Sequence, residues 1–261
     1  MKRLFILICA VLMGSISLAQ EETQTYLIFE FMEVDNDQEA FYYETEEFWE
    51  KIHEQRVNSG DIVGWDLWQL LPGGEDQGYQ YLTVTVFDDP LKMMRAGDGI
   101  MESARMAYPD LSDEELDNRL NMAGGSRDLA VRLFMEVIDS TEDDFEMKPG
   151  MIASLDLMKI REGQYEAYEN AESTTFKPWH QKYVDGGVKG NWQLLRVLMP
   201  QGTEVYTSHM TVNMFDNWEQ YLKSMSFDGG MTPDLENKMA KGLETRDMKW
   251  VYWATLVKMV R

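Results

Sequence analysis

The sequence has little cysteine, histidine or positive charge. Its 261 residues include one cysteine, Cys9, and three histidines, and 24 Lys and Arg stand against 46 Asp and Glu, for a formal net charge of −22. A surface this acidic argues against a broad site for nucleic acid or anionic membranes. A single cysteine excludes an internal disulfide and a thiolate metal site. The sequence also contains no P-loop, dinucleotide-binding glycine motif, nucleophile elbow or zinc-protease helix motif.

Residues 1–19 are typical of an export signal. Lys2 and Arg3 precede an apolar run over 4–13, and the small-residue pattern Ser-Leu-Ala ends the segment. The run is too short to span a bilayer, and no second such run follows it. We therefore expect a secreted or periplasmic protein with no membrane segment once the signal is removed. Loss of Lys2 and Arg3 would bring the formal charge to −24, and the mature chain would contain no cysteine.

Segments of the first half of the chain recur in the second half in the same order. The strand-like run 25–34 is matched by 151–160, and an acidic residue, Glu30 or Asp156, interrupts the apolar residues of each. The spacing His-x3-Val-x2-Gly-x4-Trp occurs twice, from His53 to Trp65 and from His180 to Trp192. Because order and spacing are both kept, the sequence predicts two fused copies of one unit, over residues 20–140 and 141–261.

Each unit is predicted to be α+β with the order β-α-β-β-α-β, the ferredoxin-like arrangement. Hydrophobic periodicity places one long helix at about 38–59, with Gly60 where a helix C-terminal glycine is expected. Both faces of the strands carry large apolar residues, so we expect helices on one face and the other unit's sheet on the other, closing eight strands into a barrel. The predicted strands are 25–34, 65–71, 79–87, 129–138, 151–160, 191–199, 205–215 and 248–259.

In its element order, its duplication and its tryptophan-rich first helix, the chain resembles the dimeric α/β barrel superfamily, with two units fused in tandem. The superfamily includes the antibiotic biosynthesis monooxygenases, the stress-responsive A/B barrel proteins, the chlorite dismutases and the dye-decolourising peroxidases. The resemblance implies a pocket between helices and sheet in each half for a flat aromatic or haem-like molecule, and several such relatives are cofactor-free oxygenases. The haem-binding relatives place their ligating histidine on later helical material, where this chain has none. The cofactor stays open, and a shared fold alone does not define a function.

His53 and His180 occupy matching positions in the two copies and are the candidate catalytic residues. A histidine that faces a pocket can act as a general base, whereas one bonded to the sheet serves only the structure. Pro178 lies in the helical segment of His180 and must either kink that helix or begin a new one, so the second copy is the preferred site. His209 lies in a strand, and we expect it to share a pocket with His180.

Aromatic side chains in the same segments could stack on a planar ligand, although most aromatics at such spacings belong to the core. The predicted function is an exported protein that binds a small, partly aromatic molecule, with His180 as base of a cofactor-independent oxygenase-like reaction. A non-catalytic binding or interaction protein and a haem-binding protein are the alternatives. The oligomeric state stays open. The predicted ligand-binding residues besides the histidines are Trp49, Tyr42, Trp65, Trp179, Trp192 and Tyr183.

The acidic residues are interpreted mainly as structural. Glu30 and Asp156 hold matching strand positions and are either an acid/base pair or carboxylates answered by Arg132 and Arg196. The pairs Arg127-Asp128 and Arg246-Asp247 are expected to form local ion pairs before the last strands. Glu50 and His53 have the i, i+3 spacing of a di-metal helix, but the second copy lacks the glutamate, so no metal is expected. The run 44–50 is interpreted as a solvated face.

Overall fold

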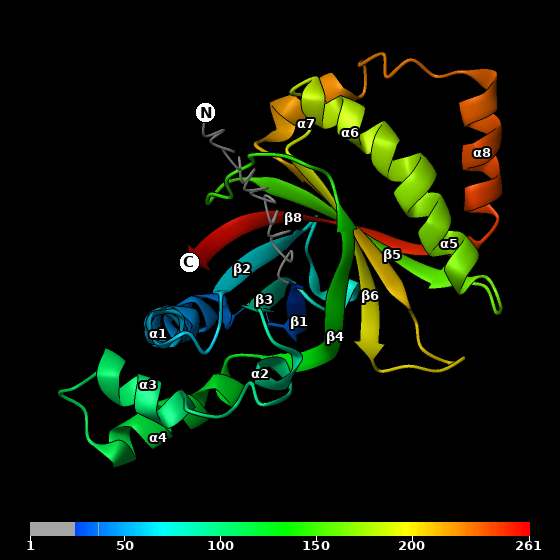
Figure 1. Ribbon diagram of the computed structural model, residues 1–261. Helices are drawn as coiled ribbons and strands as arrows, with labels where there is room; N and C mark the ends of the chain where they lie inside the picture. The colour runs from blue at the N-terminus through cyan, green and yellow to red at the C-terminus, as the bar shows by residue number, and fades with distance from the viewer. Residues whose placement is uncertain (1–23, 36) are drawn as a thin grey trace, which may run out of the picture.

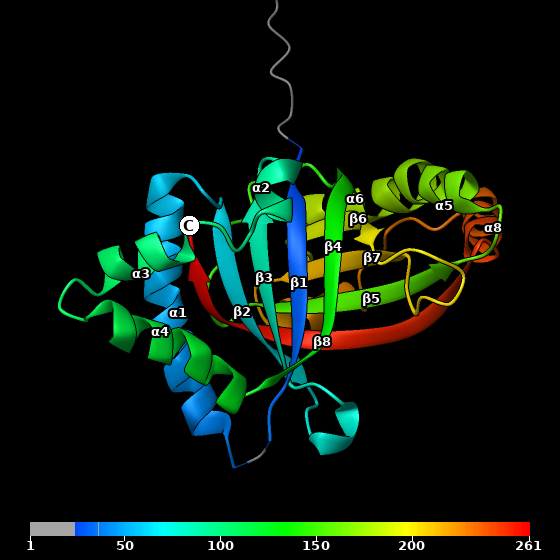
Figure 2. The same ribbon diagram turned by 90° about the horizontal axis from the view of Figure 1, so that it is seen from below.

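The computed structural model describes residues 24–35 and 37–261, and the predicted signal segment lies outside them. Within these residues eight strands form a closed antiparallel barrel in the order β1-β3-β2-β8-β5-β7-β6-β4. Figure 2 shows β2, β3, β1 and β4 side by side in this order. The strands are β1 Tyr26–Glu33, β2 Gly64–Leu71, β3 Tyr81–Phe87, β4 Asp128–Ser140, β5 Ile152–Ile160, β6 Asn191–Met199, β7 His209–Phe215 and β8 Arg246–Val260.

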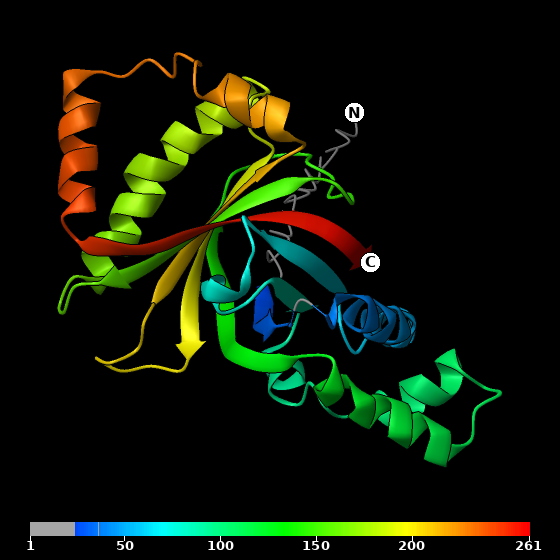
Figure 3. The ribbon, with the colours of Figure 1, turned by 180° about the vertical axis from the view of Figure 1, so that it is seen from behind.

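The helices lie outside the barrel on two opposite sides. Figures 1 and 3 show α1 to α4 on one side and α5 to α8 on the other. None of the helices in the described part of the chain is long and apolar enough to cross a membrane. The helices are α1 Glu39–Ser59, α2 Pro90–Met94, α3 Ile100–Ala107, α4 Asp113–Met122, α5 Tyr165–Ala171, α6 Lys177–Asp185, α7 Trp218–Ser224 and α8 Pro233–Leu243.

The helix α1 ends where the glycine pattern predicts. Gly60 adopts φ +77°, and its N–H donates to the carbonyl groups of Arg56 and Val57, so the last turn is closed without the steric cost that a Cβ would bring. Gly187 has φ +68° just after α6. The two glycines therefore end the two helices that carry His53 and His180.

Side chains that alternate along the strands form two separate apolar layers. The inward ones fill the barrel, where Phe29 and Leu155 belong to one cluster built from strands of both halves. The outward ones pack under helices, as Trp65 and Leu67 do beside Tyr42 of α1, and as Trp192 does beside Tyr168 of α5. The predicted α+β class and the barrel are confirmed.

Pro178 begins a new α-helix, as one of the two alternatives expects, but no loop precedes that helix. It lies in the first turn of α6, directly after a π-helical segment, Glu172–Phe176, that joins α6 to α5. Proline lacks the N–H that an α-helix needs, and the wider π turn accommodates that loss within one helical rod. The helix thus stays over the sheet along its length (Figure 3).

Candidate functional site

A cavity of about 380 Å³ lies between α1 and the outer face of the sheet formed by β1, β2, β3 and β4. Its roof comes from α1 and from the segment around α2, and its floor comes from side chains that point outward from the strands. Titratable and aromatic groups share this lining with apolar ones. The lining groups that bear on chemistry are Glu30, Glu46, Trp49, His53, Arg56, Trp65, Arg127 and Arg132.

His53 is held between two tryptophan rings at the cavity wall. Its ring centroid lies 4.9 Å from that of Trp65, with an angle of 19° between the ring planes. The centroid of Trp49 is 5.7 Å away, with an interplanar angle of 27°. Trp49 precedes His53 by one helical turn, while Trp65 reaches it from β2. This stacking fixes the plane of the imidazole. The structure thus brings together three of the residues that the sequence selects.

The arrangement around His53 also fixes its tautomer. Nη1 of Arg56 lies 3.4 Å from Nδ1 of His53, and a guanidinium can only donate. Nδ1 must therefore accept, which leaves the ring proton on Nε2. Burial, and then the charges of Arg56 and Arg127, lower the pKa of His53 well below its usual value. His53 is thus a neutral imidazole whose Nε2–H is a hydrogen-bond donor.

Glu46 is a buried carboxyl that the sequence interpretation missed. It is 1% exposed, so the prediction that the whole run 44–50 is solvated is wrong at this position. An oxygen of Glu46 lies 3.0 Å from Nη1 of Arg127, which also corrects the expected local pair between Arg127 and Asp128. Burial raises the pKa of Glu46 to about 7, against the opposing effect of Arg127. A carboxyl that titrates near neutral pH can exchange a proton with a bound molecule.

The second carboxyl at the cavity, Glu30, forms an ion pair with an arginine, which is the structural one of the two interpretations of the sequence. Arg132 lies 2.6 Å from Oε1 of Glu30, and the hydroxyl of Thr83 donates to the other oxygen at 3.4 Å. Arg132 is half exposed, so its guanidinium lies toward the solvent side of the cavity. The cavity therefore contains cationic donors that an anionic group of a ligand could use.

The same set of side chains recurs under α5 and α6. Glu172 pairs with Arg246, whose guanidinium lies over the ring of Tyr168 at 5.4 Å, as that of Arg127 lies over Tyr42 at 5.8 Å. The expected local pair between Arg246 and its neighbour Asp247 is therefore wrong as well. A signal for these groups was present in the sequence, because Tyr-x3-Glu at 42–46 returns at 168–172.

The surroundings of His180 differ from those of His53 in one respect. His180 stacks on Trp192 at 5.2 Å and 18°, but its Nδ1 lies 2.9 Å from Nζ of Lys189. Lys189 also donates to Oδ1 of Asn213 at 2.6 Å, and burial lowers the pKa of Lys189 to about 7. Asn213 in turn donates to Asp156 at 3.0 Å, so Asp156 is not answered by Arg196. Here a buried polar network lies against the sheet.

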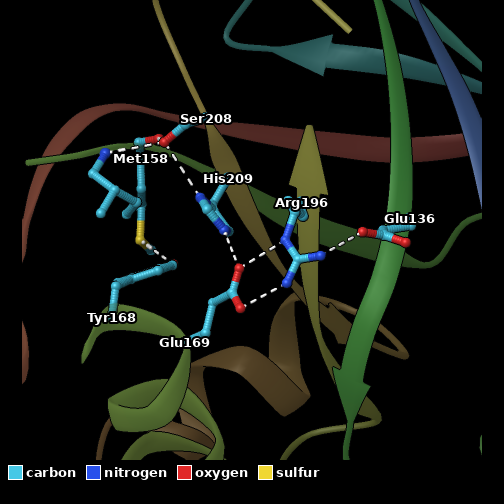
Figure 4. A network of polar contacts seen from close by, with 8 residues as sticks. Glu136, Met158, Tyr168, Glu169, Arg196, Ser208 and His209 are labelled. Carbon is cyan, nitrogen blue, oxygen red and sulfur yellow. Dashed lines mark hydrogen bonds and ion pairs between the residues drawn. The ribbon is translucent and has the colours of Figure 1, made fainter. Parts of the chain in front are cut away.

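His209 belongs to another network, centred on Glu169 (Figure 4). Its Nε2 lies 2.9 Å from Oε1 of Glu169, whose two oxygens also accept from Nε and Nη2 of Arg196 at 2.7 Å. Nη1 of Arg196 donates to Glu136 at 2.7 Å. His209 is fully buried between the rings of Tyr165 and Tyr168. Its observed contacts are thus with this cluster and not with the network of His180.

The remaining predicted ligand-binding residues lie in packed clusters. Tyr42 is buried, with its ring centroid 4.7 Å from that of Tyr81, and Trp192 is fully buried. Trp179 packs on Tyr183 at 5.1 Å, close to the chain at Gly229.

Glu50, which has the i, i+3 spacing to His53 that a di-metal helix would use, pairs instead with Lys258 at 2.7 Å. Within residues 24–35 and 37–261 no group of three or more His, Cys, Asp or Glu side chains is placed to hold a metal ion.

Comparison with known proteins identifies the fold and nothing narrower. No protein-family model and no curated protein sequence matches the chain. Solved structures do match. A protein of Lactobacillus acidophilus, named as an inferred monooxygenase, superposes with a TM-score of 0.56 at 10% identity, covering 92% of this chain and 96% of the other. An anthrone oxidase-like protein gives 0.55 at 9% identity, covering 92% and 93%. An inferred chlorite dismutase gives 0.50 at 7%, covering 90% and 96%.

The chain thus has the ferredoxin-like dimeric α/β barrel fold, as the resemblance in its sequence indicates. At these identities the likeness defines the fold alone. The function has to be argued from the side chains of the site.

Proposed function

We propose that this chain is an exported protein that binds a small, partly aromatic molecule in the cavity beneath α1. The observation that carries the proposal is the placement of His53, between Trp49 and Trp65, in the wall of a cavity of about 380 Å³. Small-molecule sites commonly measure about 300–1,000 Å³ and combine apolar walls with a few converging polar groups. The cavity meets the size criterion, its polar groups converge on it in larger number than is usual, and its tryptophans offer surfaces for a flat ring.

The side chains also provide for proton transfer. Glu46, whose pKa is raised to about 7, is suited to accept a proton from a phenolic hydroxyl. The Nε2–H of His53 and the guanidinium of Arg132 would stabilise the resulting anion. In this proposal the base is Glu46, and His53 acts as a donor.

The reaction that fits these groups is oxidation of a quinol or related polyphenol without a cofactor. Glu46 takes one proton, and the anion passes two electrons in total to dioxygen, which leaves as hydrogen peroxide after both protons are transferred. The substrate becomes the quinone, so atoms and electrons balance. Two structural neighbours carry names of an inferred monooxygenase and an anthrone oxidase-like protein, which makes hydroxylated anthracenes and quinols the first compounds to test.

The proposal includes an origin by duplication. The ring order contains β4-β1-β3-β2 followed by β8-β5-β7-β6, the same order with every number raised by four. The pairs of Glu46 with Arg127 and of Glu172 with Arg246 hold corresponding positions in the two sets. Under this proposal only the first copy keeps its site open, whereas Lys189 occupies the second.

A haem does not fit the residues around His53. An axial histidine binds iron through a nitrogen lone pair and normally donates its other N–H to an acceptor. Here Nδ1 faces the guanidinium of Arg56, a group that can only donate, so Nδ1 has neither a free lone pair for iron nor an acceptor to which it could donate if iron were bound at Nε2. We therefore assign the cavity to a ligand that is not coordinated by His53.

Oxygen uptake and ligand binding, measured together, test the proposal. A panel of quinols and hydroxylated anthracenes should include a compound that binds at micromolar concentration and consumes oxygen. Glu46→Gln should keep the binding and lose about 10²-fold in rate. Glu47→Gln, an exposed neighbour on α1, and Glu172→Gln, the buried counterpart in the other half, are the controls.

The same experiment separates the competing functions. Binding that needs Trp65 but shows no oxygen uptake or product would establish a non-catalytic binding protein. If Trp65→Ala binds every active compound as well as wild type does, the cavity beneath α1 is not the site, and the proposal fails.

A further inference from the structure

A second cavity lies inside the barrel, on the opposite side of the sheet from the cavity of His53. It measures about 260 Å³, and apolar side chains from strands of both halves surround it. The apolar residues that line it and also belong to the core cluster include Leu27, Trp68, Val84, Leu155, Val212 and Met214. These residues belong to the core that closes the barrel, where interiors are normally packed to high density. A molecule that filled this space would contact these side chains and gain the packing contacts that they lack across the cavity.

The mouth of this cavity is polar and includes an ion pair between Asp66 and Arg261. Asp66, 3% exposed, points inward from β2, and its two oxygens lie 2.8 and 3.0 Å from Nη1 and Nη2 of Arg261. Burial raises the pKa of Asp66 against the pairing with Arg261. Ser140 and Gln193 complete the polar rim. Because Arg261 already answers Asp66, a second carboxylate would have to compete for the same guanidinium.

We propose that the barrel interior binds a neutral, mainly hydrocarbon molecule with one hydroxyl group. The hydrocarbon part would lie among the side chains around Val212, and the hydroxyl would donate to Asp66 at the mouth. An apolar cavity of about 150 Å³ takes up benzene, so about 260 Å³ has room for roughly eight to twelve non-hydrogen atoms. Medium-chain alcohols and alkylphenols have this size and polarity.

The geometry favours an alcohol over a fatty acid of equal length. A carboxylate at the mouth would lie against the carboxylate of Asp66, which is buried and cannot be relieved by solvent. An alkane would leave the polar rim without a partner from the ligand. The hydroxyl group of the ligand therefore determines specificity, and Asp66 recognises it by accepting its hydrogen bond.

The test is titration with 1-octanol, followed through the methyl resonances of methionines labelled with carbon-13. We expect a saturable shift confined to Met214 and Met147, which line the cavity, with octanoate binding at least tenfold more weakly. Val212→Phe fills the cavity and should abolish the shift, whereas Val251→Phe, at an exposed position of β8, should not. Asp66→Asn should remove the preference for octanol over octanoate.

Failure of this inference is distinguishable from failure of the proposed function. Octanol binding should be unchanged in Glu46→Gln and Trp65→Ala, because those residues line the other cavity. If octanol leaves Met214 and Met147 unshifted in the wild-type protein, the interior site is refuted even if Val212→Phe does not fold. A shift that persists in a folded Val212→Phe protein refutes it as well.

Discussion

Nζ of Lys189 lies 2.9 Å from Nδ1 of His180, and this contact distinguishes the environment of His180 from that of His53. The position that corresponds to Lys189 in the first half is Ile62, which is buried in the apolar layer under α1. There the imidazole of His53 meets Arg56 instead and lines a cavity. The partner of the imidazole nitrogen thus differs between the two environments, being Arg56 beside His53 and Lys189 beside His180.

The buried lysine should make the stability of the protein depend on pH. Burial lowers the pKa of Lys189 from 10.5 to about 7, so above pH 7 the unfolded chain binds a proton that the folded protein does not. The free energy of unfolding should therefore rise with pH, by about 2 kcal/mol between pH 7 and pH 9, because Lys189 is already half deprotonated in the folded protein at pH 7. Urea denaturation at several pH values measures this increase.

Lys189→Met should lose that increase, because a thioether does not titrate. Lys223→Met, at an exposed position of α7, should keep it. Equal pH dependence in wild type and Lys189→Met would mean that Lys189 stays charged in the folded protein. The environment of His180 would then have to be described differently.

Glu46 should set the pH dependence of the proposed reaction. The carboxyl must be ionised to accept a proton, and burial raises its pKa to about 7. The rate should rise with pH through about 7 and level off above it, as expected for a single general base. This rise of the rate with pH should be absent in Glu46→Gln and present in Glu172→Gln. If the rate still rises with pH in Glu46→Gln but no longer does so in His53→Gln, the base is His53.

Haemin provides a test of how His53 is held. Because Arg56 faces the lone pair of Nδ1, we expect no Soret band attributable to histidine ligation when the purified protein is mixed with haemin. Arg56→Leu removes this donor and is the comparison variant. A wild-type Soret band that disappears in His53→Ala would show that the imidazole can ligate iron, contrary to the tautomer argued above.

The fold could be predicted closely because its signals are local and repeated. Strand periodicity placed the strand of residues 191–199 at its observed bounds, and Gly60 marked the end of α1. The site was harder, because its chemistry depends on burial. Glu46 lies among acidic neighbours, and nothing in its immediate sequence separates it from the exposed Glu47. Burial under α1, which only the tertiary fold produces, makes Glu46 a group that titrates near neutral pH, while its pairing with Arg127 opposes that shift.

The same reason explains the wrong partners assigned to the arginines. Arg132 and Arg196 both lie in predicted strands and are expected to pair with Glu30 and Asp156, yet β6 presents Arg196 to Glu169 of α5 and to Glu136 of β4. The choice between these carboxylates depends on strand register and on the position of α5. Sequence spacing does not contain either quantity, so the prediction followed charge alone.

Glu169 should be a stability determinant, because it is the one acceptor shared by His209 and Arg196 (Figure 4). Burial raises its pKa, but hydrogen bonds from Arg196 and His209 outweigh burial and bring the pKa below its usual value. Such a carboxylate stabilises the fold above the unfolded-state pKa and loses that effect as the pH falls through the folded-state value. Glu169→Gln should therefore lower the free energy of unfolding by about 1 to 3 kcal/mol at neutral pH.

This difference should shrink in acid, where wild-type Glu169 is itself protonated. Glu166→Gln, one turn earlier on α5 and exposed, controls for the loss of a charge on the same helix and should change stability by less than about 0.5 kcal/mol. Urea denaturation at neutral pH and in acid measures both variants. A Glu169→Gln protein as stable as wild type at neutral pH would mean that Glu136 alone suffices to hold Arg196, and that the bond from His209 adds nothing to the fold.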